Sequence, residues 1–170
     1  MPMFSSLELN TLEDLFVEQI EDLYDAEKRL TSALPEMEKA ATNPQLKDAF
    51  RSHLRETEGQ VARLESIFRT LGRDPSRETC EAMKGLIKEG SDIVNAKGDT
   101  SVKDAALIAA AQRVEHYEIA GYGSARTFAQ RLGHTDAARL LQETLDEEAA
   151  ADKKLTAIAN GNVNIQAQRA

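Results

Sequence analysis

Two glutamates, Glu115 and Glu118, lie in the stretch QRVEHYEIAGYG from Gln112 to Gly123, where a helix is otherwise apolar on one side. At roughly 100° per residue, Glu118 falls near the middle of the apolar face and Glu115 about 50° from its centre. A buried carboxylate is costly unless it is paired, hydrogen-bonded or bound to a metal. These two residues therefore predict a compensating partner in the core. The apolar face consists of Leu107, Ile108, Ala111, Val114, Ile119, Tyr122 and Ala125.

The other long stretches with helical spacing also place a carboxylate at or near their apolar side. Glu27 lies about 40° from the centre of such a face. Glu56 lies at the edge of another, which includes His53 and Gln60. Acidic residues thus occur near the core in four separate helices. On the last helix the candidates are Glu148, near the leucine stripe, and the flanking Glu143, Glu147 and Asp152.

A weak internal repeat relates two of these stretches. The segment LRETEGQ, residues 54–60, aligns with LQETLDE, residues 141–147, at the shared Leu, Glu and Thr. In this alignment Glu56 corresponds to Glu143, and Gln60 corresponds to Glu147. The repeat therefore favours Glu147 as the inward residue of the last helix, whereas the helical wheel favours Glu148.

This residue pattern is related to that of dinuclear metal sites in helical bundles. Such iron or manganese sites use one Glu from each of two helices and a Glu-x-x-His pair from each of the other two. The glutamates are present, but no Glu-x-x-His occurs in the chain, and His53 precedes Glu56 by three residues. We expect an oxygen-rich site with Gln60 or Glu147 in place of the usual histidines, and His53 as a ligand or as the partner of one. Such a site is weakly selective for iron over manganese or zinc.

The spacing of apolar residues predicts a single all-α domain. Long helices are expected at 11–41, 44–71, 101–132 and 135–159. A weaker crossover helix is expected at 75–96 and a polar tail at 160–170. Helix-start signals support three of the long helices. These signals are Asn10 with Glu13, Asn43 with Pro44, and Ser101 with Asp104.

The long connection between the second and third long helices decides the predicted topology. Short loops throughout would give an up-and-down bundle, whereas one long crossover makes those two helices parallel. This is the ferritin-like arrangement, with an antiparallel helix pair on each side of a pseudo-twofold axis. The predicted fold is therefore a ferritin-like antiparallel four-helix bundle with a helical crossover.

Composition excludes several functional classes. The 170 residues carry a net charge of −8, and the basic residues are scattered, so a nucleic-acid-binding surface is not expected. No apolar run is long enough for a membrane span, and no secretory leader is evident, so we expect a cytoplasmic protein without a membrane partner. The single cysteine, Cys80, cannot form an internal disulfide.

Several of these motifs resemble those of the YciF-like stress-protein family, whose ferritin-like members are related in fold to rubrerythrin. The resemblance covers about Thr11 to Asn164 and is carried by LYDAEKRL, HLRETEGQVARLE, AALIAAAQRVEHYEIAGYG and LLQETLDEEAAADKKLT. It implies a homodimer, induction under stress and a metal site in the bundle core. The implied metal positions are Glu27, Glu56, Gln60, Glu115, Glu118, Glu143 and Glu147.

Two functional hypotheses follow. In the first, a dinuclear metal site, with iron as the expected metal, acts on oxygen or peroxide in a stress-response protein. In the second, the protein is a dimeric structural or interaction protein whose carboxylates form a metal-free polar core. An iron-storage cage or a DNA-protecting mini-ferritin is disfavoured, because the chain has no basic tail.

Overall fold

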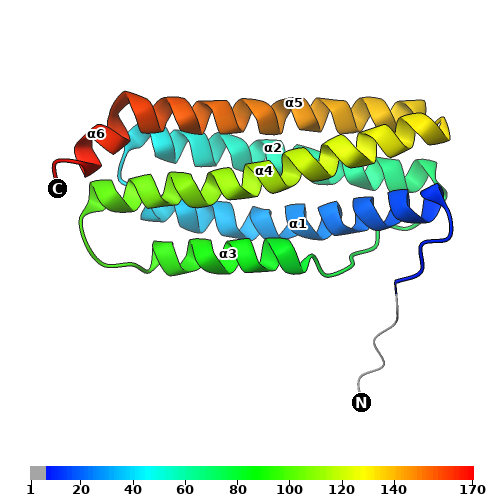
Figure 1. Ribbon diagram of the computed structural model, residues 1–170, viewed down its shortest axis with the longest axis horizontal. Coiled ribbons are helices and arrows are strands. Elements are labelled where there is room, and N and C mark those ends of the chain that lie inside the picture. Colours follow the sequence, from blue (N-terminus) through cyan, green and yellow to red (C-terminus); the bar gives the residue numbers. More distant parts are fainter. Residues whose placement is uncertain (1–6) are drawn as a thin grey trace, which may run out of the picture.

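The computed structural model describes residues 7–170, and all regular secondary structure in that range is helical (Figure 1). The predicted all-α class is confirmed. Each of the four long helices begins and ends within one residue of its predicted bounds. The elements are α1 (Leu12–Ala40), α2 (Pro44–Thr70), α3 (Glu81–Val94), α4 (Thr100–Leu132), α5 (Thr135–Ile158), the π-helical turn η1 (Ala159–Val163) and α6 (Asn164–Ala167).

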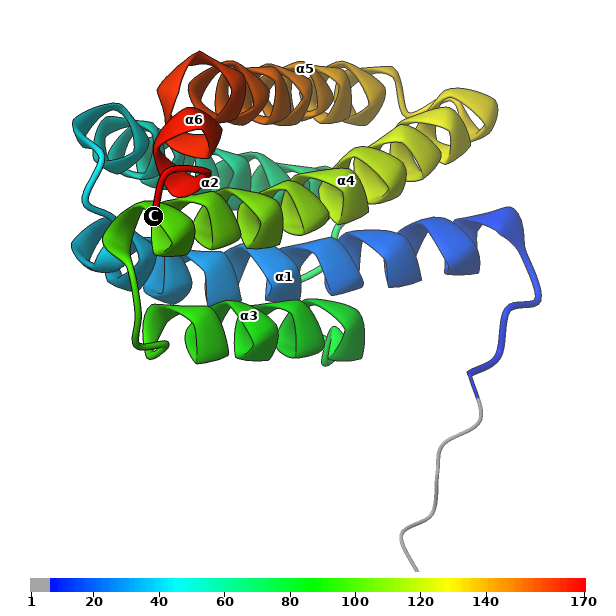
Figure 2. The same cartoon turned by 60° about the vertical axis from the view of Figure 1, so that its left-hand side comes forward.

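The four long helices form the bundle, and α3 lies outside it. Figure 1 shows α1 and α5 running in one direction and α2 and α4 in the other, so α2 and α4 are parallel, as predicted. The neighbouring pairs are α1 with α2, α4 with α5, α1 with α4, and α2 with α5. The crossover helix α3 packs against α1 and α4, on the side away from α5 (Figure 2). This is the topology expected for one long connection in a four-helix bundle.

Side-chain caps fix where the helices begin, with two differences from prediction. Asn43 caps α2 as expected, and its side chain accepts hydrogen bonds from the first turn. The capping box of α1 is formed by Thr11 and Asp14, one residue after the predicted pair. Helix α4 is capped by Asp99 rather than Ser101. The predicted partner of Ser101, Asp104, is buried instead and binds the loop between α1 and α2.

The crossover helix begins later than predicted because a buried carboxylate holds the chain that precedes it. Asp25 of α1 accepts hydrogen bonds from Arg77 at 2.7 Å and from the backbone N–H of Cys80 at 2.9 Å. Cys80 then caps α3, which starts at Glu81. The segment before Cys80 is therefore non-helical, although it was included in the predicted helix at 75–96.

The chain end predicted as a polar tail continues in helical form. After α5 the backbone passes through η1 into α6 without an extended residue. Val163 and Ala159 are buried and join the apolar core, which gives this segment its own packing. Two inward apolar residues thus keep the last turns in contact with the bundle.

A polar layer divides the apolar core into two clusters along the bundle. On α4, one cluster ends at Val114 and the other begins at Tyr122, and the two glutamates Glu115 and Glu118 lie between them. The same division occurs on the other three helices. The buried polar residues of this layer include Glu27, His53, Thr57, Gln60, Glu115, Glu118, Thr144 and Glu148.

Candidate metal centre

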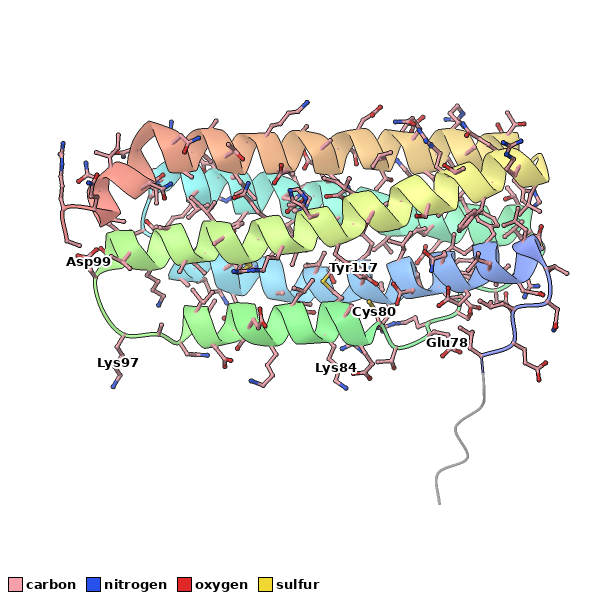
Figure 3. The ribbon with its side chains drawn as sticks, in the orientation of Figure 1. Glu78, Cys80, Lys84, Lys97, Asp99 and Tyr117 are labelled. Carbon is pink, nitrogen blue, oxygen red and sulfur yellow. The ribbon has the colours of Figure 1, made fainter. Side chains whose placement is uncertain are left out.

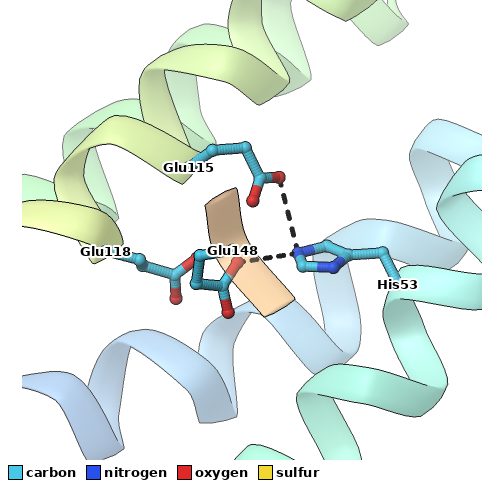
Figure 4. Close-up of side chains that lie close together, drawn as sticks. All are labelled: His53, Glu115, Glu118 and Glu148. Atoms are coloured by element: carbon cyan, nitrogen blue, oxygen red, sulfur yellow. Dashed lines mark ion pairs between the residues drawn. The ribbon is translucent and has the colours of Figure 1, made fainter. Parts of the chain in front are cut away.

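Four buried side chains from three helices converge at the middle of the bundle (Figure 4). His53 comes from α2, Glu115 and Glu118 come from α4, and Glu148 comes from α5. Each offers one potential ligand atom, and these atoms all lie within 4.8 Å of one another. Positions i and i+3 lie on the same helical face, which explains why Glu115 and Glu118 both reach this point. This arrangement is a candidate metal site.

The imidazole of His53 connects the four-residue cluster with a half-exposed carboxylate. Its Nδ1 lies 3.1 Å from Glu56 Oε2, and its Nε2 lies 3.4 Å from Glu115 Oε1 and 3.6 Å from Glu148 Oε2. Burial alone would lower the pKa of His53, but the hydrogen bond to Glu56 and the charge of Glu148 outweigh that effect and raise it. A hydrogen bond from Nδ1–H to Glu56 would leave the Nε2 lone pair directed at the cluster.

Glu27 brings the fourth helix, α1, to the same layer. It is fully buried, and its Oε1 accepts a hydrogen bond of 2.5 Å from the hydroxyl of Tyr122. Burial, followed by repulsion from Glu148, raises the pKa of Glu27 well above its usual value. Tyr122 is buried, as its place on the predicted apolar face implies, and its hydroxyl binds this carboxylate.

The cluster contains more buried acceptors than the protein can satisfy. Burial raises the pKa of Glu118 well above its ordinary value, with a further contribution from the charges of Glu27 and Glu148. Burial and the charge of Glu148 do the same for Glu115. In the part of the chain that the structure describes, seven buried atoms of this group have no hydrogen-bond partner. They are Glu27 Oε2, His53 Nε2, Glu115 Oε2, both carboxylate oxygens of Glu118 and both of Glu148.

Three other predicted ligand positions lie beside the cluster. Arg63 binds Glu147 with two hydrogen bonds, of 2.6 and 2.7 Å. Gln60 is fully buried and donates its amide to the same carboxylate at 3.1 Å. The side chain of Glu143 is 45% exposed and pairs with Arg139. The structure thus places Glu148 in the cluster instead of Glu143 and Glu147, because a turn of α5 directs those two towards arginines at the surface.

The chain is similar in sequence to a known protein family. A family model described as a domain of unknown function, DUF892, matches residues 11–168. Protein YciF of Escherichia coli K12 is 46% identical over 163 residues, which cover 95% of this chain and 98% of YciF. This chain belongs to the YciF-like DUF892 family.

Solved structures of YciF-like proteins share the fold. The crystal structure of the E. coli stress protein YciF matches with a TM-score of 0.88 and 47% identity, over 92% of this chain and 99% of that one. YcfI of Rhodopseudomonas palustris, described as a candidate structural protein, matches with a TM-score of 0.86 and 46% identity, over 90% and 98% of the two chains. A Xanthomonas campestris protein with 20% identity and a TM-score of 0.73 shares the fold.

The one cysteine of this YciF-like chain is not among the four residues of the cluster and lies close to Tyr117 (Figure 3). Cys80 is buried, and its Sγ is 3.0 Å from the hydroxyl of Tyr117, which in turn hydrogen-bonds Asp22. Burial raises the pKa of the thiol to about 11. The thiol is therefore protonated at neutral pH, and Cys80 serves as a small residue of the core.

No helix in residues 7–170 of this YciF-like protein is long and apolar enough to cross a membrane.

Proposed function

We propose that this protein is a stress-related metalloprotein with a dinuclear centre in the bundle core. The observation that carries the proposal is a group of seven buried atoms, from four helices, that have no hydrogen-bond partner among the described residues. Cations are the simplest compensation for carboxylates in a dry interior. We infer the link to stress from the E. coli relative, which is described as a stress protein.

Charge balance favours two ions over one. Glu27, Glu115, Glu118 and Glu148 are all buried and would carry four negative charges when ionised. Two divalent cations would neutralise that charge, whereas a single ion would leave about two charges uncompensated in the core. Carboxylate oxygens with one imidazole suit iron or manganese, and zinc is also compatible. We take iron as the first candidate.

The protein's own groups prepare these ligands. Glu56 fixes the tautomer of His53 through Nδ1, and Tyr122 orients Glu27 through its hydroxyl. The glutamates must lose their protons when metal binds, so loading releases protons to solvent. Bound iron would supply an open coordination position for oxygen or peroxide.

Metal analysis of protein purified without chelator tests this function, with two variants of one helix as a matched pair. We expect about two ions per chain in the wild type. Glu148→Gln should weaken binding at least about tenfold, because it removes a buried ligand charge. The control Glu143→Gln changes an exposed residue of the same helix and should retain full metal content. Equal metal content in both variants would exclude Glu148 from the site.

A second candidate is a structural protein with a metal-free polar core. It is favoured by the description of YcfI as a candidate structural protein and by the raised pKa values of the clustered glutamates, which allow them to be protonated and to share hydrogen bonds. Wild-type protein without metal, and with a melting temperature that added Fe²⁺ or Mn²⁺ leaves unchanged, would favour this alternative. The homodimer implied by the family stays a proposal, which sizing chromatography with light scattering tests.

A further inference from the structure

A small cavity connects the surface of the bundle with the cluster between α2 and α5. Its volume is about 90 Å³, which is enough for a few waters or one partly hydrated ion, since a water needs at least about 10–15 Å³. His53 and Glu115 line it and are themselves members of the cluster. The full lining is Ala49, Phe50, Ser52, His53, Glu56, Glu115, Ala150, Ala151, Lys154 and Leu155.

The lining changes from exposed to buried along the cavity. Ala150 and Lys154 are exposed and the side chain of Glu56 is 40% exposed, whereas Glu115 is only 2% exposed. The gap exists at this height because α5 presents small residues, Ala150 and Ala151, towards α2. Glu56, His53 and Glu115 therefore form a series of potential metal ligands that leads from solvent to the centre.

Two other regions around the centre do not open onto the cluster. Between α1 and α4 the helices are in close contact, since a Cβ atom placed on Gly121 would lie 2.8 Å from Leu23 Cδ2. A cavity of about 730 Å³ lies among α1, α3 and α4 and is lined by none of the cluster residues. The cavity between α2 and α5, in contrast, is lined by two cluster residues, His53 and Glu115.

The geometry points to this cavity as the route by which single metal ions reach the centre, with Glu56 as the first carboxylate they meet and Ala150 and Ala151 as the residues that set its width. This inference rests on the metal centre proposed above. Glu56 is the more exposed of the two carboxylates in the lining, with 40% of its side chain exposed. An ion held at Glu56 needs only ligand exchange to reach His53 and Glu115, since all three line the same cavity.

The width of the route also defines what it admits. A hydrated ion that has lost part of its water shell fits the volume, whereas a metal still enclosed in an organic chelate does not. Loading from free Fe²⁺ should therefore be fast, and loading from a bulky ferrous chelate should be limited by release of the ion from that chelate.

Blocking the cavity tests the route. Metal-free protein is mixed anaerobically with Fe²⁺, and unbound ion is captured at timed intervals by a chromogenic chelator. Ala151→Leu should slow loading by at least about tenfold, and it should slow extraction by EDTA by the same factor, so the dissociation constant and final stoichiometry stay unchanged. Ala157→Leu makes the same substitution at an exposed position of α5 outside the cavity and should leave both rates as in the wild type.

Glu56→Gln gives a second, less disruptive test that also covers a failure of the leucine variant to fold. It should slow loading several-fold and weaken binding through the lost hydrogen bond with His53, whereas saturating Fe²⁺ should still fill the same number of sites. Rates equal to wild type in both variants, with metal still bound, would overturn the route and leave the metal centre intact. A wild-type protein that binds no metal would overturn the metal centre itself.

Discussion

Asp25 and Asp104 are buried about as deeply as the glutamates of the cluster, but the protein surrounds them with donors. Asp25 binds Arg29, Arg77 and the backbone of Cys80, and Asp104 accepts three hydrogen bonds from Thr42 and Asn43. The carboxylate of Glu118, at the same depth, has no hydrogen-bond partner on either oxygen within residues 7–170. One chain thus contains buried carboxylates with complete hydrogen bonding and buried carboxylates with almost none.

The difference separates a structural role from a binding role. Burial would raise the pKa of Asp25, but hydrogen bonds from Arg29, Cys80 and Arg77 outweigh burial and lower it. In the cluster, burial and mutual repulsion act in the same direction and raise the pKa of Glu118. Asp25 is therefore stable as an anion without any ligand, whereas Glu118 needs either a proton or a cation.

Removing metal should have the largest effect on stability. A ligand present at 100 to 1,000 times its dissociation constant stabilises the folded state by about 2.7–4.1 kcal/mol per site. We therefore expect two ions to contribute roughly 5 kcal/mol or more, and EDTA to lower the Tm by on the order of 10–20 °C. Calorimetry with and without EDTA measures this. A Tm that EDTA leaves unchanged would indicate that the cluster is compensated by protons.

Asp25→Asn should have the next largest effect on stability, and this effect should not depend on metal. The variant loses the charge that holds Arg77 and the start of α3, and removing one partner of a buried ion pair typically costs about 3 kcal/mol. The control Asp92→Asn breaks an exposed pair with Lys88 on α3 and should cost less than about 0.5 kcal/mol. Denaturant unfolding with and without EDTA checks both. A cost that depended on EDTA would mean that Asp25 and the cluster are coupled.

The two kinds of buried carboxylate should also respond to pH in opposite directions. In metal-free protein, Glu118 is protonated when folded and ionises when unfolded as the pH rises above about 4.5. The folded state then binds more protons, so stability falls by up to about 1.4 kcal/mol per pH unit for each such group. Asp25 acts in the other direction, since its contribution is lost as the pH falls through its lowered folded pKa.

Denaturation of metal-free protein between pH 5 and pH 7 (roughly the range above the ordinary glutamate pKa) measures this slope. Glu118→Gln removes one titrating group and should make the fall with pH shallower, whereas Asp25→Asn should leave the slope in this range unchanged. An identical slope in wild type and Glu118→Gln would show that Glu118 does not take up a proton on folding.

The fold and half of the site were predictable from the sequence for separate physical reasons. Helical spacing fixed the bundle, and it placed Glu115, Glu118 and Glu148 correctly, because the apolar face of a helix has a regular period. The internal repeat was misleading about the glutamates. The repeated threonine is buried on both helices, as Thr57 and Thr144. The repeated glutamate, Glu56 and Glu143, lies towards the outer side of each helix.

Partners distant in the sequence could not be predicted from local spacing. The hydrogen bond between Glu147 and Arg63 joins residues 84 positions apart, and it keeps Glu147 out of the cluster. The pairing of His53 with Glu56 in reversed order is visible in the sequence, but only the tertiary structure shows that the imidazole points inward and the carboxylate outward. Periodicity shows which side of a helix faces the core. Tertiary contacts decide which of the acidic residues on that side are already bound by another protein group.

Tyr122→Phe should have the smallest effect on stability and gives the sharpest test of the number of ions. Its hydroxyl is the only described hydrogen-bond partner of Glu27, so its loss should cost about 1–2 kcal/mol. It should also weaken metal binding by about tenfold, because it positions a ligand. Tyr24→Phe is the matched control, since the hydroxyl of Tyr24 bonds the partly buried Glu65 away from the cluster.

Titration calorimetry with Fe²⁺ or Mn²⁺ separates the possible outcomes for Tyr122→Phe. If Tyr122→Phe weakens only one of two binding events, then Glu27 belongs to the second ion, and the carboxylates with no protein partner are shared between two cations. If neither event changes, Glu27 is not a ligand, and both ions are held by His53, Glu115, Glu118 and Glu148.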